Sequence, residues 1–157
     1  MYNSYTMKYF AYGMNTNLAQ MAMRCPNAKC LGAARLPNHQ FRFARHADIL
    51  PIPGFVTHGV LWEITDDCLI SLDALEGYPN YYQRKTVTVQ HQLQSIETMT
   101  YYMIGNIPDE SPGPGYVEML QQGYFENRVP DQQINQALDF VQKYHTALAK
   151  KSQYIYG

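Results

Sequence analysis

Five stretches of β-type sequence, spread over the first two thirds of the chain, constrain its fold most strongly. They are residues 9–12, 34–44, 55–64, 85–91 and 96–104. In the third stretch Val60, Trp62 and Ile64 share one face, because successive side chains of a strand point to opposite sides. Gln92–Ser95, between the last two stretches, is short enough for a hairpin loop. The pattern predicts a small, partly closed antiparallel sheet or barrel.

Helical signals occur early, in the middle and late in the chain. Residues 18–22 repeat apolar side chains at helical spacing before Pro26 stops the helix, and residues 65–76 lead to Gly77, a natural C-terminal cap. A third helix is expected after Asp131. Its apolar face consists of Ile134, Ala137, Leu138, Val141 and Leu148. Strands with helices on either side along the chain favour a mixed α+β fold.

Two segments rich in proline and glycine predict loops. Residues 45–54 hold two prolines and Gly54, and residues 108–115 are richer still in helix breakers. Too few residues follow the second segment for a confident second domain, so a functional loop is favoured over a linker. We therefore predict a single domain over residues 1–157, with residues 1–7 as a candidate disordered arm.

Charge and cysteine content exclude several classes of protein. A formal net charge of -1 with scattered Lys and Arg argues against a nucleic-acid partner. No apolar run approaches the ~20 residues that a membrane span needs, and no secretory signal is visible. Cys25, Cys30 and Cys68 are odd in number and fit no zinc motif, so free thiols in a cytoplasmic setting are expected. The histidines form no metal-like pair, so no metal is expected.

Glu76 has the sequence context best suited to proton transfer. It ends the helix of residues 65–76, where the helix macrodipole disfavours negative charge, and a turn follows at Gly77. Burial beside that turn would also raise its pKa towards the range useful for general acid–base catalysis. On this context alone, an ordinary solvated glutamate at a helix end is the commoner interpretation.

Gly13 and Tyr116 carry weaker signals. Gly13 falls where a strand turns into a helix, and the N–H groups of such turns bind carboxylates or phosphates, although a plain tight turn is the commoner interpretation. Tyr116 follows the loop of residues 108–115 and can either close over a ligand or anchor the loop in the core.

Two further kinds of site stay open from the sequence. A thiol nucleophile would pair Cys25 or Cys30 with a distant histidine, but buried structural thiols are the better interpretation. An anion site could use arginines, for which solvated positions are the default. The candidates are Arg24, Arg35, Arg42 and Arg45.

Taken in order, four segments resemble the γ-glutamylcyclotransferase family, also called AIG2-like. They are Tyr9-Phe10-Ala11-Tyr12-Gly13-Met14-Asn15, Gly59-Val60-Leu61-Trp62-Glu63-Ile64, Leu72-Asp73-Ala74-Leu75-Glu76-Gly77 and Pro114-Gly115-Tyr116. They fall within roughly residues 8 to 130. No single segment is decisive, but the ordered set is fairly specific to the family.

The resemblance implies a compact, mixed or antiparallel β-barrel with flanking helices, and an enzyme that uses neither metal nor cofactor. The implied reaction releases 5-oxoproline from a small γ-glutamyl substrate, with Glu76 as the general acid/base. Gly13 and Met14 would offer backbone donors. The implied substrate-binding residues are Tyr9, Phe10, Ala11, Tyr12, Gly13, Met14 and Tyr116.

Met14 is a departure, because the family loop usually reads Tyr-Gly-Ser-Asn. A backbone donor survives this change and a side-chain hydroxyl does not, which affects substrate identity more than reaction class. Relatives act on γ-glutamyl amino acids, γ-glutamylamines or γ-glutamyl-tagged antibiotic precursors. The alternative function is a non-catalytic small-ligand-binding or regulatory module on the same fold. The sequence does not predict the oligomeric state.

Overall fold

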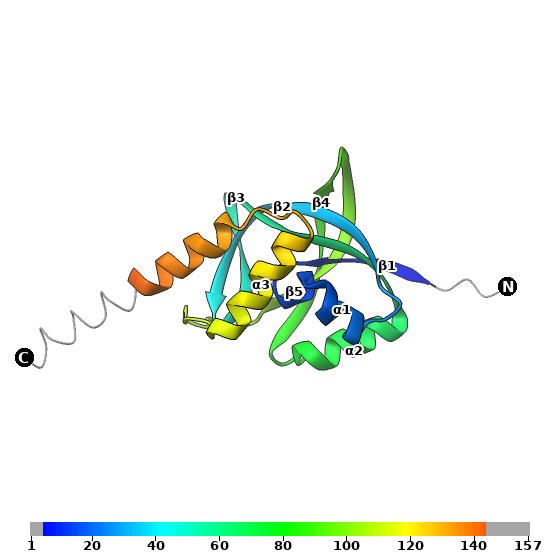
Figure 1. Cartoon of the computed structure of the whole chain (residues 1–157), viewed down its shortest axis with the longest axis horizontal. Coiled ribbons are helices and arrows are strands. Elements are labelled where there is room, and N and C mark those ends of the chain that lie inside the picture. The colour runs from blue at the N-terminus through cyan, green and yellow to red at the C-terminus, as the bar shows by residue number, and fades with distance from the viewer. Residues whose placement is uncertain (1–4, 144–157) are drawn as a thin grey trace, which may run out of the picture.

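The computed structural model describes residues 5–143, which form a closed barrel of five strands with helices packed around it (Figure 1). The strands are β1 (Thr6–Ala11), β2 (Lys29–Ala44), β3 (His46–Thr65), β4 (Tyr82–His91) and β5 (Gln94–Met103). The helical elements are the 3-10 turn η1 (Met14–Thr16), α1 (Leu18–Arg24), α2 (Asp66–Glu76), α3 (Pro114–Glu126) and a further helix over residues 132–143.

The strand order around the barrel is β1-β3-β2-β4-β5. β3 pairs antiparallel with both β1 and β2, and β4 forms an antiparallel hairpin with β5. An antiparallel bridge between Arg35 and Gln90 joins β2 to β4, and a parallel bridge between Tyr9 and Met99 joins β1 to β5. The predicted α+β fold with a small mixed barrel is therefore confirmed.

The core joins the strands to the helices around them. Its largest fully buried side chains come from three strands, from α1, α2 and α3, and from the helix over residues 132–143. They are Phe10, Met21, Leu36, Phe43, Ile49, Val60, Leu61, Ile64, Leu72, Leu120, Tyr124 and Ile134. Each buried apolar side chain of this size contributes about 1.5–3 kcal/mol relative to exposure, so the helices are held firmly against the barrel.

Local sequence sets both ends of α2. Thr65, the residue before the helix, accepts a hydrogen bond from Cys68 N at 3.5 Å. At the other end Gly77 adopts a left-handed conformation (φ 65), and Tyr78 N donates to Asp73 O at 3.0 Å. The helix therefore stops at Glu76 as predicted, with this carboxylate at its C-terminal end.

The loop predicted over residues 45–54 is wrong, because β2 and β3 form one long hairpin whose turn is at Arg45 (φ 70). The ladder shifts register between Pro37 and His39, and His39 pairs with Pro51. At a bulge the hydrogen bonds between the strands are interrupted, so prolines, which have no N–H to donate, are tolerated here.

α3 was not expected, because the run of proline and glycine around residue 113 is typical of a loop. Gly113 is the residue before the helix, and Pro114 occupies its first turn. A helix leaves its first N–H groups without internal partners, so proline costs no hydrogen bond there. Tyr116 therefore lies in a helix and not in the loop.

The start of the chain is more ordered than expected in the part that the structure describes. Thr6 and Met7 belong to β1 and pair with Thr65 and Ile64 of β3. The prediction of a disordered arm is therefore wrong for these two residues, and residues 1–4 lie outside the described part.

The cysteine prediction is wrong for two of the three residues. Cys25 and Cys68 form a disulfide, with their Cα atoms 5.0 Å apart, and Cys30 is free and exposed. The partners are 43 residues apart and meet only because the end of α1 packs on the first turn of α2, so their spacing gives no signal. Disulfides are rare in reducing compartments, so the cytoplasmic location stays a prediction without its thiol argument.

The late helix is confirmed as far as residue 143, with Ile134, Ala137 and Val141 buried. Leu148, also expected on its apolar face, lies outside the described residues. None of the helices within the described residues is long and apolar enough to cross a membrane.

Candidate active site

One cavity of about 180 Å³ is lined by side chains from nearly every element. This volume is below the roughly 300–1,000 Å³ of pockets for drug-sized ligands, so the cavity suits a compact molecule. About half of its lining residues are aromatic, and tyrosine supplies both an apolar ring and a polar tip. The lining residues are Tyr9, Phe10, Tyr12, Gly13, Met14, Asn15, Arg24, His46, Ala47, Leu75, Glu76, Tyr81, Tyr82, Tyr101 and Tyr116.

Glu76 provides the carboxyl group of this cavity. Burial raises its pKa from 4.5 to about 7, and the positive charge of Arg24 opposes part of that rise. Near neutral pH the carboxyl therefore exists in both protonation states. A group of this kind can accept a proton and return it within one reaction cycle.

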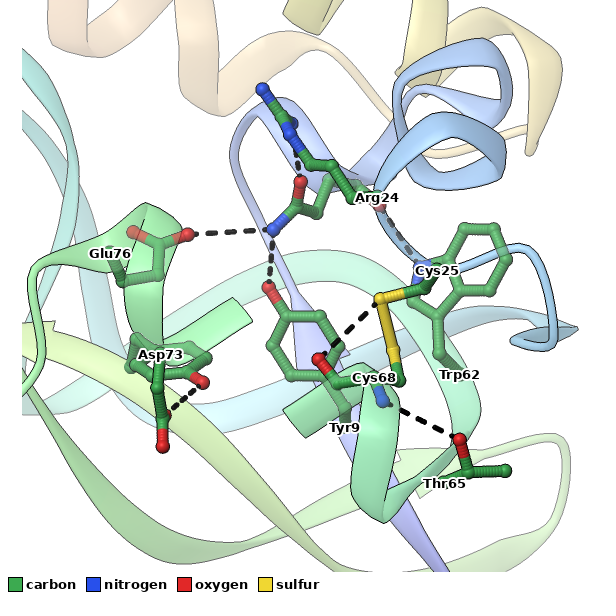
Figure 2. Close-up of a disulfide and its surroundings, with 10 residues drawn as sticks. Tyr9, Arg24, Cys25, Trp62, Thr65, Cys68, Asp73 and Glu76 are labelled. Atoms are coloured by element: carbon green, nitrogen blue, oxygen red, sulfur yellow. Dashed lines mark hydrogen bonds between the residues drawn. A yellow bond between two sulfur atoms is a disulfide. The ribbon is translucent and has the colours of Figure 1, made fainter. Parts of the chain in front are cut away.

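The amide of Asn15 connects Glu76 to two other lining residues, Tyr9 and Arg24. Figure 2 labels these three residues, and its dashed lines join them to the unlabelled amide between them. Asn15 Nδ2 donates to Glu76 Oε1 at 3.4 Å and to the Tyr9 hydroxyl at 3.1 Å. Its Oδ1 accepts a 2.7 Å hydrogen bond from Arg24 Nη1. One amide thus joins β1, α1 and the end of α2.

Three hydrogen bonds hold the turn before α1, one from within the turn and two from other elements. Trp62 Nε1 donates to Asn15 O at 3.0 Å, Thr16 Oγ1 donates to Gly13 O at 2.7 Å, and the Tyr124 hydroxyl of α3 donates to Tyr12 O. The backbone of residues 12–16 is therefore fixed by β3, by η1 itself and by α3.

Two backbone N–H groups of this turn are available to a ligand. Within residues 5–143 the amides of Gly13 and Met14 have no hydrogen-bond acceptor, and both residues line the cavity. Successive unpaired N–H groups in a turn form a site that favours anions.

Tyr116 both lines the cavity and anchors α3. Its hydroxyl accepts a 2.9 Å hydrogen bond from Ala47 N, and its ring packs edge-on against Phe43 and His46. Burial raises its pKa above the usual value, so the phenol is neutral and can donate to a ligand. The two sequence interpretations of Tyr116, ligand contact and structural anchor, are therefore compatible.

Comparison with known proteins gives a consistent family. A sequence model of the family described as "Gamma-glutamyl cyclotransferase, AIG2-like" matches residues 9–124. The γ-glutamylcyclotransferase of Bos taurus is 31% identical over 135 residues, which cover 78% of this chain and 72% of the relative. The chain belongs to this family.

Further γ-glutamylcyclotransferases agree with this assignment. The Homo sapiens protein is 30% identical, again over 78% of this chain and 72% of the relative. A solved structure titled "Gamma-glutamyl cyclotransferase" superposes with a TM-score of 0.76 and 27% identity, covering 83% of this chain and 86% of that one. The suspected family is confirmed.

The structure brings nearly all of the predicted site residues of this γ-glutamylcyclotransferase-family chain together. Glu76, Tyr9, Phe10, Tyr12, Gly13, Met14 and Tyr116 all line the cavity. Ala11 does not line it and pairs with Val60 within the barrel. The roles assigned to these residues stay predictions.

Sequence reasoning missed several lining residues. Asn15 stood in the family segment but received no role, and Arg24 appeared only among four candidate arginines. Leu75 precedes Glu76 in α2, and barrel closure brings the others to the cavity from β3, β5 and the start of β4. These further residues are His46, Ala47, Leu75, Tyr81, Tyr82 and Tyr101.

The thiol site gains no support, and of the four candidate arginines Arg24 alone lines the cavity. Cys25 is in a disulfide and Cys30 does not line the cavity. Arg42 forms an ion pair with Asp48 at 2.9 Å and lies elsewhere. Among the residues that the structure describes, no cluster of His, Cys, Asp and Glu could hold a metal ion.

Proposed function

We propose that this chain is a γ-glutamylcyclotransferase that releases 5-oxoproline and an amine or amino acid from a small γ-glutamyl substrate. The observation that carries the proposal is the buried carboxyl of Glu76, with a pKa of about 7, in a compact cavity. Its setting in a family whose named relatives are γ-glutamylcyclotransferases supports the same reaction.

The reaction needs proton transfer and correct folding of the substrate. The substrate's α-amine attacks its own γ-carbonyl carbon, a C–N bond forms in a five-membered ring, and the bond to the leaving nitrogen breaks. Glu76 takes one proton from the α-ammonium group before the attack and passes it to the leaving nitrogen as the C–N bond breaks. The ring nitrogen loses a second proton, which protonates the released amine, so that no proton is gained or lost overall. No protein nucleophile and no cofactor is required.

Substrate orientation falls to the turn of residues 12–16 and to Tyr116. The free amides of Gly13 and Met14 bind the α-carboxylate, which points the α-amine towards Glu76. The neutral Tyr116 hydroxyl donates a hydrogen bond to the substrate. Holding the chain folded for ring closure can supply about 7–11 kcal/mol in favourable cases.

The test is mass-spectrometric detection of 5-oxoproline with wild-type protein and the Glu76→Gln variant. The substrate panel contains γ-glutamyl amino acids and γ-glutamylamines with leaving groups of increasing size. We expect product from the wild type and a loss of at least about a hundredfold in the variant, the lower end of general-base effects. Turnover by Glu76→Gln near the wild-type rate would exclude Glu76 from the mechanism.

A different outcome would favour the non-catalytic alternative. If folded wild-type protein binds a γ-glutamyl compound but releases no 5-oxoproline, the chain is a ligand-binding module on the same fold. Met14 would then be the first residue to change, because a Met14→Ser variant restores the usual family loop.

A further inference from the structure

Arg24 lies beside Glu76, yet the proposed reaction gives it no role. It occupies the last turn of α1, where the helix macrodipole favours a cation, and it lines the cavity. Its Nη1 donates to Asn15 Oδ1 at 2.7 Å, and its Nη2 lies 3.0 Å from Met14 Sδ. Within residues 5–143 no ion pair includes Arg24.

The chemistry of the guanidinium fixes the orientation of Asn15. Arginine carries only donors, whereas an asparagine amide has one accepting and one donating end. The Oδ1 end must therefore face Arg24, and the Nδ2 end must face Glu76 and Tyr9 (Figure 2). Without the guanidinium, the amide could rotate and bring its oxygen to the carboxylate.

We propose that Arg24 is a positioning residue for Glu76, acting through Asn15, whose amide it holds with the N–H donor towards the carboxylate. A donor in this position favours the ionised carboxylate, which is the form that accepts the proton. The inference rests on the proposed function, because it assigns to Glu76 the proton transfer of that reaction.

The charge of Arg24 acts in the same direction as the amide. Burial disfavours the Glu76 carboxylate, and the nearby positive charge partly offsets that cost. The absence of a direct ion pair within the described residues matters here, because a contact pair would hold the carboxylate ionised well below neutral pH. An indirect contact through one amide leaves the carboxyl able to hold and release a proton.

The main neighbouring groups that can titrate come from every element around the cavity. They are Tyr9 of β1, Tyr12 directly after β1, His46 of β3, Tyr81 and Tyr82 at the start of β4, Tyr101 of β5 and Tyr116 of α3. Burial raises the pKa of each tyrosine, so all six phenols stay neutral at physiological pH. Burial and the charge of Arg45 lower the pKa of His46, so it loses its proton at lower pH than Glu76.

The first test follows the carboxyl carbon of Glu76 by NMR during a pH titration of ligand-free protein. The samples carry carbon-13 at the glutamate side-chain carboxyl, and the Glu76→Gln spectrum identifies the resonance. We expect the midpoint of Arg24→Met to rise by about one pH unit relative to wild type, and Arg24→Lys to recover at least half of that shift. The control, Arg35→Met, removes an exposed arginine outside the cavity and leaves the midpoint unchanged.

The second test is the pH profile of kcat/KM for 5-oxoproline release. Its acidic limb reports the base of the free enzyme. In Arg24→Met the limb moves to higher pH by the same amount, so the loss is about tenfold near pH 6 and small near pH 9. A merely structural role would lower the whole profile without moving the limb.

The two tests separate this inference from the proposed function. An unmoved NMR midpoint in folded Arg24→Met overturns the role of Arg24, even if the enzyme is active. A raised midpoint without 5-oxoproline from any variant supports the positioning of the carboxyl and overturns the proposed reaction. If Arg24→Met does not fold, Arg24→Ala, which lacks both the charge and the donors, takes its place in both tests.

Discussion

Glu76 is held where its charge is unfavourable. The carboxyl lies at the C-terminal end of α2, against the helix macrodipole, and burial raises its pKa to about 7. The positive charge of the Arg24 guanidinium opposes part of that rise. Such an arrangement favours the protonated carboxyl and lowers the stability of the folded protein when Glu76 is ionised. Shifted pKa values of this kind are common at catalytic positions.

The raised pKa has a measurable effect on folding stability. The folded carboxyl has a pKa of about 7, and the pKa of an unperturbed glutamate is 4.5. Between these two values the folded protein binds more protons than the unfolded chain, so the free energy of unfolding falls as pH rises. We expect Glu76→Gln to gain about 2 kcal/mol of stability relative to wild type between about pH 5 and about pH 8.

Urea unfolding of both proteins across this pH range measures the difference. The comparison with Glu76→Gln cancels the contributions of the other titrating groups. A constant stability difference between the two proteins at all pH values would mean that Glu76 titrates normally in the folded state.

The residues of the site differ in how far their roles can be read from the sequence. Glu76 was predicted from local signals, a helix end and a following glycine turn, taken together with the resemblance to the family. Asn15 and Arg24 were not, because their roles depend on contacts between β1, α1 and α2 that exist only in the folded barrel. Long-range contacts leave no mark in the local pattern of one sequence.

At the scale of elements, α3 packs directly on the turn that forms the cavity wall. Gly123 of α3 faces Thr16 and Asn17, and Asn127, which follows α3, donates to Thr16 O at 2.8 Å. A Cβ built on Gly123 would lie 2.6 Å from Asn17 N and 2.7 Å from the carbonyl carbon of Thr16. The helix can approach the turn this closely only with a glycine at this position.

Gly123→Ala therefore separates packing from helix propensity. Alanine favours a helix by about 1 kcal/mol over glycine, but the clash with backbone atoms cannot be relieved by a side-chain rotation. We expect a net destabilisation of about 1–3 kcal/mol and reduced kcat/KM, because the turn must shift. The measurements are urea unfolding and 5-oxoproline release.

Gly115 provides the matched control within the same helix. A Cβ on Gly115 meets no atom within 4 Å, so Gly115→Ala should keep or slightly raise stability. Equal effects of the two substitutions would show that the contact between α3 and the turn does not limit stability.

The Cys25–Cys68 disulfide joins α1 and α2, the helices that carry Arg24 and Glu76. It connects the residue after Arg24 to the first turn of α2, the helix that ends at Glu76 (Figure 2). A bond that closes a loop of this length contributes about 3–4 kcal/mol by restricting the unfolded chain. Both α1 and α2 are short, so the disulfide and η1 help to hold them in place beside the cavity.

Elements with strong local signals were predicted well, and those set by context were not. The alternating strands and α2 follow from residue pattern and caps. The turn at Arg45 and the start of α3 do not, because prolines and glycines resemble loop signals whether they sit in a bulge, in a first helical turn or in a loop. The disulfide depends on tertiary packing in the same way.

At the scale of the whole molecule, the helix over residues 132–143 is integrated with the barrel. Gln133 accepts a hydrogen bond from His58 N at 2.7 Å and donates to His58 O at 2.8 Å, and it also donates to the Tyr124 hydroxyl at 2.7 Å. Ile134 and Val141 are buried in the common core. These contacts cross from the end of the described chain to β3 and α3, as expected if the chain is a single domain.

The single-domain prediction can be tested by unfolding with two probes. The chain has one tryptophan, and Trp62 is buried in β3 with its Nε1 bonded to the turn at Asn15, so its fluorescence reports the barrel and the cavity wall. Far-UV circular dichroism reports mainly the helices, including the one over residues 132–143. Because shared core and hydrogen bonds couple these parts, we expect coincident urea midpoints and slopes from both probes. An earlier transition in the dichroism alone would mean that the late helix unfolds separately from the barrel, and that the chain contains more than one cooperative unit.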